Sequence, residues 1–313
     1  DNHLHIWTGN GSPSFDGDWS LPGNWKGGVP VETCPVLIPH PSTLPTDNNG
    51  DNYPARNLLP IITTAKAITL EIASGAVFEI EEDYDITIFG KGDAWVNDGT
   101  FVPGTATVIF DHPYDDDLIP VSISGTTDFY DITITDETFI QPTNNSIVRI
   151  ENSISSLSSS ILDFSTTTNT IEYNGLDQGI VNPNGGTTGY YNLSLSGSGI
   201  KSLPTETLQI INDFSLSESA SAISKNDLTV GNDLNISNTS DLSITADKTL
   251  TINGNINNSV GNSGLVLKST NDGTASLIHD TNNVPATVER YISGAAEDWH
   301  FLSSPVSNQI IKP

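Results

Sequence analysis

A short pattern of apolar residues recurs along this chain at a nearly constant interval. Three segments align without gaps: LQIINDFSLS from Leu208, LTVGNDLNIS from Leu228 and LTINGNINNS from Leu250. They follow one another after 20 and then 22 residues. Within each segment the apolar residues lie two positions apart, which is the spacing of side chains on one face of a β-strand. The repeat therefore predicts similar strands stacked on one another, with Leu208, Leu228 and Leu250 in one interior column and Phe214, Leu234 and Ile256 in another.

A longer repeat is superimposed on the short one. TVIFDHP from Thr107 matches TIEYNGL from Thr170, and DFYDITIT from Asp128 matches GYYNLSLS from Gly189, at offsets of 63 and 61 residues. These offsets correspond to three turns of about 21 residues. A meander has no reason to repeat in phase, whereas each turn of a solenoid packs on the equivalent turn before it. We predict an all-β fold, a right-handed parallel β-helix with an N-terminal capping region; tandem β-sandwiches are the alternative.

Composition agrees with this fold class and limits the partners. Ser, Thr, Asn, Asp and Gly fill the space between short apolar pairs, and they favour turns and strands over helices. The formal net charge of −27 disfavours nucleic acid and anionic membranes as partners. The sequence contains no run of 18 apolar residues, so we predict no membrane span. Cys34 is the only cysteine, so the chain is expected to form no internal disulfide.

We divide the sequence into three parts: a Trp-rich cap at 1–60, the β-helix at 61–283, and a capping or linking segment at 284–313. The chain contains no Met and starts at Asp1, so we expect that a leader peptide has been removed. The pattern is still running at Pro313, and we expect a further domain to follow.

The two ends of the chain carry motifs that resemble a known group of proteins. The N-terminus reads IWTG (Ile6–Gly9), DWS (Asp18–Ser20), NWKGGVP (Asn24–Pro30) and VLIP (Val36–Pro39), and VERYISGAAEDWHFLSSPVS runs from Val288 to Ser307. In this order they resemble large cell-surface or secreted proteins that Bacteroidota export by the type IX secretion system. The resemblance implies an extracellular location on a Gram-negative bacterium. It also implies that a C-terminal domain outside this chain contacts the secretion machinery.

Three tryptophans in the N-terminal motifs are the candidate glycan contacts. Trp7, Trp19 and Trp25 could stack on sugar rings. Alternatively, they close the end of the solenoid, because an uncapped turn exposes apolar side chains and unpaired backbone groups. Trp299 and His300 suggest the same capping role at the outgoing end.

Acidic side chains are the candidate metal ligands, and Ca²⁺ is the only cofactor they suggest. Asp115, Asp116 and Asp117 form an acidic run whose oxygens suit calcium, although the spacing of a calcium-binding loop is missing. Asp213 and Asp233 fall one turn apart, so their like charges could recruit a cation. The simpler interpretation is a solvated loop in the first case and a ladder of stacked polar side chains in the second.

These features predict a structural function. We expect an extracellular scaffold or adhesin-type module that contacts glycans or other surface proteins. The alternative is a polysaccharide-active β-helix enzyme, a lyase or a glycoside hydrolase. A lyase needs a basic residue, and the sequence offers only Arg56, Arg149 and Arg290, all isolated, with scattered lysines. Paired carboxylates for hydrolysis could come from distant turns. The sequence itself predicts no catalytic or cofactor-binding residue.

Overall fold

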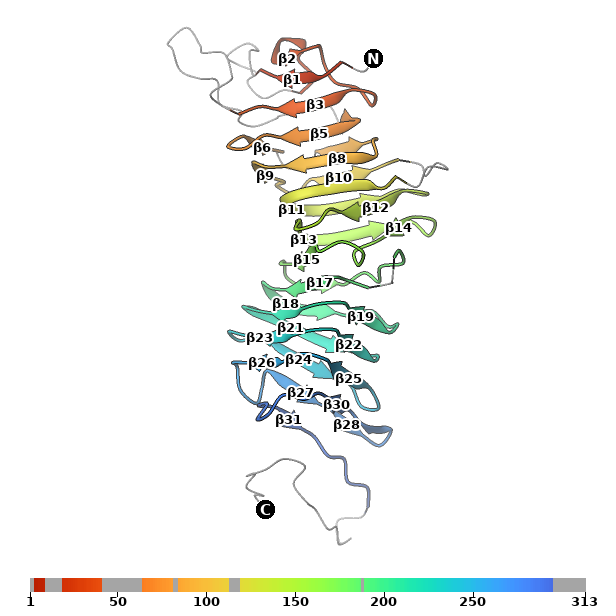
Figure 1. Ribbon diagram of the computed structural model, residues 1–313, viewed down its shortest axis with the longest axis vertical. Coiled ribbons are helices and arrows are strands. Elements are labelled where there is room, and N and C mark those ends of the chain that lie inside the picture. Colours follow the sequence, from red (N-terminus) through yellow and green to blue (C-terminus); the bar gives the residue numbers. More distant parts are fainter. Residues whose placement is uncertain are drawn as a thin grey trace.

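The structure is a computed structural model that describes residues 3–8, 19–40, 64–80, 84–112, 119–186 and 189–294. Parallel strands stack into a rod of about ten turns, with the N-terminal strands at one end and strand β31 at the other (Figure 1). The described part contains no α-helix; its one helical element is the short 3-10 helix η1 (Pro22–Asn24). The all-β parallel β-helix predicted from the repeats is therefore confirmed.

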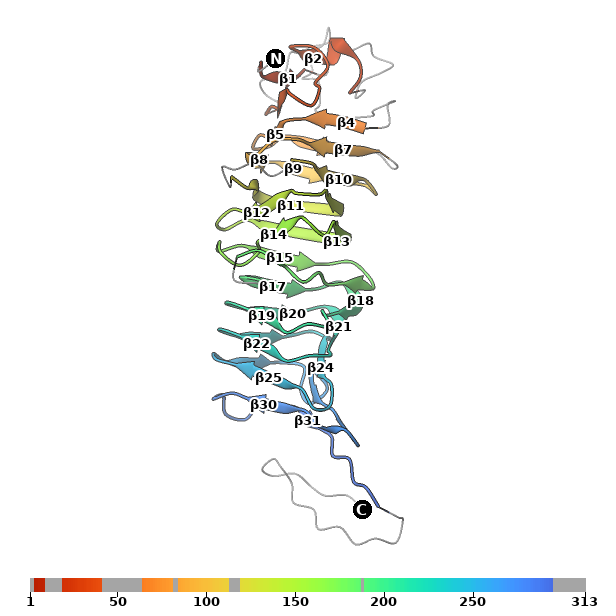
Figure 2. The same cartoon turned by 90° about the vertical axis from the view of Figure 1, so that its right-hand side faces the viewer.

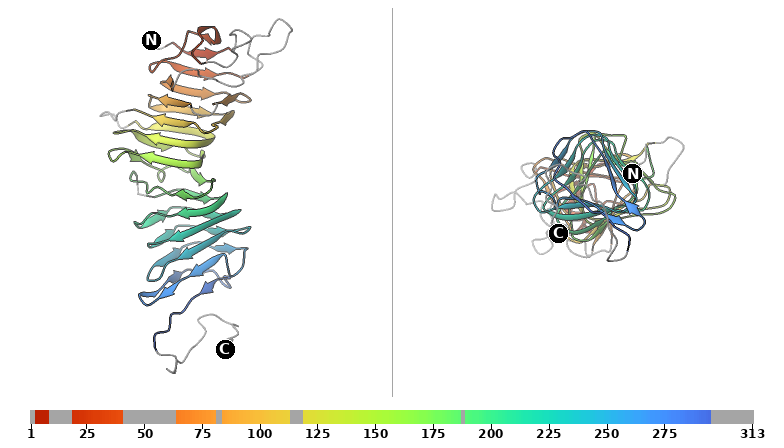
Figure 3. Two further views of the ribbon diagram at one scale, coloured as in Figure 1. Left: turned by 180° about the vertical axis from the view of Figure 1, so that it is seen from behind. Right: turned by 90° about the horizontal axis from the view of Figure 1, so that it is seen from below.

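Each full turn of the helix contributes strands to three faces, which we number in chain order. The 90° view shows the strands lying across the rod, and the view along the rod shows them forming walls around a common interior (Figures 2 and 3). Strand β11 (Val121–Ile134) runs through all three faces of one turn, because its first part pairs with β8 and its last part pairs with β10.

The faces contain the following strands. Face one holds β3 (Pro35–Ile38), β5 (Thr69–Ile72), β8 (Gly92–Asn97), the start of β11, β12 (Phe139–Pro142), β14 (Ile161–Leu162), β19 (Leu208–Ile210), β22 (Leu228–Val230), β25 (Thr249–Ile252) and β30 (Ser276–Ile278). Face two holds β6 (Val77–Glu79), β9 (Thr100–Val102), the middle of β11, the start of β13 (Ile147–Ser156), β15 (Thr170–Tyr173), β17 (Asn192–Leu195), β20 (Phe214–Leu216), β23 (Leu234–Ile236) and β26 (Ile256–Asn258). Face three holds β4 (Thr64–Ala67), β7 (Asp85–Ile88), β10 (Thr107–Phe110), the ends of β11 and β13, β16 (Gln178–Gly179), β18 (Ser198–Ser202), β21 (Ser219–Ser224), β24 (Asp241–Ile244), β27 (Leu265–Leu267) and β31 (Thr287–Val288).

The register of the strands confirms the predicted interior columns. On face one Leu208 pairs with Leu228, and Leu228 pairs with Leu250. On face two the same relation links Phe214, Leu234 and Ile256. All six side chains are buried, since a parallel stack places equivalent residues of successive turns on the same side of the wall.

The corners between faces need sharp backbone turns. Several corner residues have a positive φ, among them Asn145 (62°), Glu218 (57°) and Asn238 (59°). Asparagine tolerates this left-handed conformation better than most residues, because its side chain bonds the nearby backbone. The Asn- and Gly-rich linkers of the repeats are thus the corners of the solenoid.

The N-terminal segment closes one end of the rod. Strand β1 (His5–Trp7) pairs with β2 (Trp25–Lys26) in the antiparallel direction and with β3 in the parallel direction. β3 in turn pairs with β5, so the parallel ladder starts earlier than the predicted boundary at residue 61. At the other end β27 pairs with β31, beyond the predicted boundary at residue 283. The short antiparallel pair β28 (Ser269–Thr270) and β29 (Gly273–Thr274) lies within the last described turn.

Candidate functional site

The three N-terminal tryptophans are part of the cap. Trp7, Trp19 and Trp25 are 2%, 4% and 6% exposed. Their rings contact one another edge to face, with centroids 5.0 Å apart for Trp7 and Trp25 and 4.6 Å apart for Trp19 and Trp25. Trp19 also lies 6.4 Å from the ring of Phe78 in β6. A sugar cannot stack on a ring that protein already covers, so their burial argues against the glycan role and for the capping role.

The acidic side chains considered for calcium fall into two groups. Asp115, Asp116 and Asp117 lie outside the described residues. Asp213 and Asp233 lie one turn apart at the corner that precedes face two, as their place before β20 and β23 requires. Among the residues that the structure describes, no group of three His, Cys, Asp or Glu side chains is arranged to hold a metal ion.

Asp213 and Asp233 belong to a ladder of hydrogen bonds between turns. Oδ1 of Asp213 accepts from the backbone N–H of Asp233 (3.1 Å) and from the amide of Asn232 (2.7 Å). Oδ1 of Asp233 accepts in the same way from the backbone N–H (2.7 Å) and the amide (3.2 Å) of Asn255. Each carboxylate thus satisfies donors of the next turn, which favours the stacked ladder over a shared cation. Calcium binding at this pair stays a prediction.

A groove runs along the corner between faces two and three. It has a volume of ≈ 500 Å³. We call it the corner groove; its lining residues are Tyr130, Glu151, Asn152, Asn174, Gly175, Leu176, Asp177, Gly197, Ser198, Glu218 and Ser219. These residues come from five successive turns, between β11 and β21. With strands about 4.8 Å apart, five turns span roughly 19 Å along the rod.

Two glycines at this corner bring the chains of successive turns close together. A Cβ atom on Gly175 would lie 1.7 Å from the carbonyl oxygen of Glu151. A Cβ atom on Gly197, whose φ is +72°, would lie 2.2 Å from the carbonyl oxygen of Asn174. Only glycine allows such an approach, so the wall of the groove here is backbone that carries no side chain.

A buried lysine lies directly behind the groove. Lys201 of β18 is 0% exposed, and its side chain points into the solenoid. Its Nζ donates to the carbonyl oxygens of Gly175 (2.7 Å) and Leu176 (2.8 Å) and to Oε1 of Gln178 (2.6 Å). These three acceptors match the three donors of an ammonium group, so the buried charge is fully hydrogen-bonded.

Gln178 completes this polar cluster. Its Nε2 donates to the carbonyl oxygens of Ile150 (2.9 Å) and Asn152 (3.1 Å) on the preceding turn. Its Oε1 accepts from the backbone N–H of Gly175 (2.9 Å) as well as from Lys201. Gln178 and Lys201 therefore join three successive turns and fix the backbone that forms the groove wall.

The electrostatic character of the groove is negative. Glu151, Asp177 and Glu218 line it, and no Lys or Arg is among the lining residues. Burial lowers the pKa of Lys201 to about 8, although the charges of Asp177 and Glu218 act in the opposite direction. At neutral pH one buried positive charge therefore stands behind three carboxylates.

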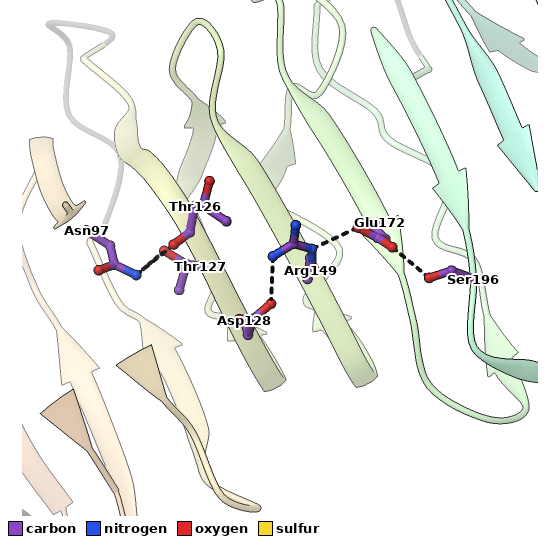
Figure 4. A network of polar contacts seen from close by, with 7 residues as sticks. All are labelled: Asn97, Thr126, Thr127, Asp128, Arg149, Glu172 and Ser196. Atoms are coloured by element: carbon purple, nitrogen blue, oxygen red, sulfur yellow. Dashed lines mark hydrogen bonds and ion pairs between the residues drawn. The ribbon is translucent and has the colours of Figure 1, made fainter. Parts of the chain in front are cut away.

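The exposed side of face two carries a second polar network, next to the groove (Figure 4). Nη1 of Arg149 lies 3.2 Å from Oδ1 of Asp128, and its Nε lies 2.9 Å from Oε2 of Glu172. Ser196 donates to the other oxygen of Glu172 (2.6 Å). Figure 4 also labels Asn97 and Thr127, which are both buried; the amide of Asn97 donates to the hydroxyl of Thr127 (3.1 Å). The guanidinium of Arg149 is thus occupied by two carboxylates and does not neutralise the groove.

The fold defines the class of the protein: it is a parallel β-helix, or β-solenoid, with a polar exterior and a capped N-terminal end. Comparisons with protein-family models, with curated proteins and with solved structures found no match. Within the described residues no helix is long and apolar enough to cross a membrane.

Sequence analysis missed the corner groove. The local signal was present, because NGLDQG (Asn174–Gly179) and SGSGIK (Ser196–Lys201) are Gly-rich turns that break the apolar alternation, and each carries a long polar side chain. What the sequence could not show is that Gln178 and Lys201 point inward. In a solenoid that depends on the register of each turn, and a shift by one residue would expose both side chains.

Proposed function

We propose that this chain is an extracellular, rod-shaped scaffold of the adhesin type, exported to the surface of a Gram-negative bacterium, where it contacts glycans. The observation that supports a structural function is the stack of parallel turns from β3 to β31, which buries apolar columns along most of its length. Such a stack supports a stiff spacer, since every turn adds one strand spacing of length and buries its apolar residues on its neighbours. The resemblance of the terminal motifs to type IX secretion proteins supports export, with a C-terminal domain outside this chain as the partner of the secretion machinery.

The proposal is tested by locating the protein in the bacterium that encodes it. Antibodies raised against the folded rod are applied to intact cells and to lysed cells, with a cytoplasmic protein as the control. We expect labelling of intact cells, and loss of that labelling after brief protease treatment that leaves the cytoplasmic control uncut. Labelling that requires lysis would overturn the proposal.

A polysaccharide-active enzyme is the second candidate, because the corner groove carries several carboxylates. Two of them already accept backbone hydrogen bonds: Asp177 Oδ1 from Ile200 N–H (2.7 Å) and Glu218 Oε2 from Gly197 N–H (2.8 Å). Hydrolysis needs one carboxyl group that donates a proton to the leaving oxygen, and in both of these side chains one oxygen already accepts a backbone hydrogen bond. A lyase needs a basic residue that reaches the substrate. The basic residue nearest to the groove is Lys201, and all three of its donors are hydrogen-bonded inside the solenoid, behind the groove wall. These contacts favour binding over turnover.

A further inference from the structure

We propose that the corner groove binds an extended saccharide chain that carries free amino groups, lying along the axis of the rod. The inference rests on the proposed function and specifies its glycan contact, now at the corner of faces two and three instead of at the N-terminal tryptophans. Four features of the groove support this proposal: its length, its backbone groups that are already hydrogen-bonded, its free side chains and its negative charge.

The length and direction of the groove fit a linear ligand. Its lining residues recur at the same corner of five successive turns, from Tyr130 of β11 to Glu218 and Ser219, where β21 begins. A ligand in contact with all of them runs perpendicular to the strands for roughly 19 Å. A chain of several linked units matches this shape better than a compact small molecule.

The backbone of the groove is already hydrogen-bonded, which disfavours an extended peptide. Ser198 N–H donates to the carbonyl of Gly175 (3.1 Å), and Ser219 N–H donates to the carbonyl of Gly197 (2.9 Å). Gly175 N–H donates to Gln178. A peptide strand binds by pairing with a free sheet edge, and this corner offers none. Recognition here must come from side chains, which suits a ligand rich in hydroxyl groups.

Several side chains of the groove are free to contact such a ligand, and two of them are large enough to reach it from the rim. Tyr130 and Glu151 make no side-chain hydrogen bond or ion pair with the described residues. The Tyr130 ring offers an apolar body and a hydroxyl, the combination that suits a sugar with its C–H and O–H faces. Leu176, which is 73% exposed, adds apolar surface beside it.

The charge of the groove selects among saccharides. Glu151, Asp177 and Glu218 repel a uronic acid chain and attract an ammonium group, and a carboxylate–ammonium hydrogen bond is stronger than a neutral one. The second oxygens of Asp177 and Glu218 are not needed for their backbone contacts. The groove therefore fits amino sugars with a free amine, and the interaction weakens with salt.

The test is calorimetric titration of the full chain with a linear glucosamine tetramer at low ionic strength. We expect saturable 1:1 binding that is about tenfold weaker for Glu151→Gln, since a charge-assisted hydrogen bond is lost, and similarly weaker for Tyr130→Ala. Glu137→Gln is the matched control, because it removes one exposed carboxylate at a different corner and should leave the affinity unchanged. Circular dichroism checks that each variant is folded.

Three further ligands distinguish recognition of an amino sugar from unspecific attraction of positive charge. A galacturonate tetramer should not bind, and an N-acetylglucosamine tetramer should bind more weakly than the amine. Equal binding of tetralysine would mean unspecific attraction of cations and would overturn the proposal, as would equal loss of affinity in the Glu137→Gln control or no binding of the glucosamine tetramer. The surface-labelling experiment is independent of these outcomes, so the scaffold function can survive the failure of the groove. Release of shorter sugars during the titration would instead favour the enzyme.

Discussion

One interior column of face three changes its chemistry along the rod. Near the groove it holds Gln178 and Lys201, and the following turns hold Ala222, Leu242 and Leu265 at the paired positions. All five are buried. The apolar turns stack because equivalent positions carry equivalent residues, whereas the polar turns are held by hydrogen bonds that bind the corner backbone. The difference shows that one solenoid can combine regular turns for stiffness with an irregular stretch that shapes a surface.

The largest expected effect comes from a charge in the regular region. Leu228→Asp should lower the free energy of unfolding by about 4 kcal/mol or more, because an unpaired carboxylate replaces a leucine between Leu208 and Leu250 in a dry interior. Urea unfolding followed by circular dichroism measures the change. Thr229→Asp places the same charge on the outward side of the same strand and should change stability by about 0.5 kcal/mol or less. Equal effects of the two variants would contradict the inward direction of Leu228.

The second largest loss of stability is expected when the side-chain amide of Gln178 is removed from the polar cluster. Gln178→Leu should cost about 3 kcal/mol, since it removes one acceptor from a buried ammonium and also the hydrogen bonds of the amide with the carbonyls of Ile150 and Asn152 and with the N–H of Gly175. The matched substitution Ala222→Gly in the apolar turns tests a cavity of one methyl group and should cost less. If Gln178→Leu were neutral, the polar cluster would contribute nothing to the stability of the wall.

The buried Lys201 should make the free energy of unfolding depend on pH. Its pKa of about 8 in the folded state lies below the ordinary value of 10.5, so between these two pH values the unfolded chain binds more protons. The free energy of unfolding gains a contribution from Lys201 that increases with pH across this window and is constant below it. The measurement is the urea midpoint from pH 7 to pH 10 for the wild type and for Lys201→Met. The urea midpoint of the wild type should rise relative to that of Lys201→Met as the pH increases. Curves that stay parallel over this range would contradict a buried, charged lysine.

The Asp213–Asp233 ladder should give the smallest effect. Asp213→Asn keeps an oxygen that accepts from Asp233 N–H and from Asn232, so stability should change by about 0.5 kcal/mol or less, while Asp213→Ala should cost about 1 kcal/mol. Melting temperatures in Ca²⁺, in Mg²⁺ and in NaCl of equal ionic strength should rise alike through screening. A rise specific to Ca²⁺ that disappears in Asp213→Asn would establish the calcium site instead.

The two regions also differ in how far the sequence predicts them. Leu208, Leu228 and Leu250 could be aligned by inspection, because identical residues recur where identical environments recur. The packing of Trp7, Trp19 and Trp25 as a cap followed from the exposed end that any solenoid must cover. Gln178 and Lys201 could not be placed, since polar residues at interior positions break the alternation from which the register is inferred. The groove depends on that register and on the close approach at Gly175 and Gly197, and neither is visible in a single turn.

Deletion of one whole turn tests the central claim, that stacked equivalent turns hold this molecule together. Removing residues 228–249 joins Asp227 to Leu250, so that Leu250 should pair with Leu208, Ile256 with Phe214, and Leu265 with Ala222, leaving the corner groove intact. Small-angle X-ray scattering should show a folded rod that is shorter by about one strand spacing, roughly 4.8 Å, with the affinity for the glucosamine tetramer unchanged. An unfolded or aggregated product, or a folded one of unchanged length, would contradict the account.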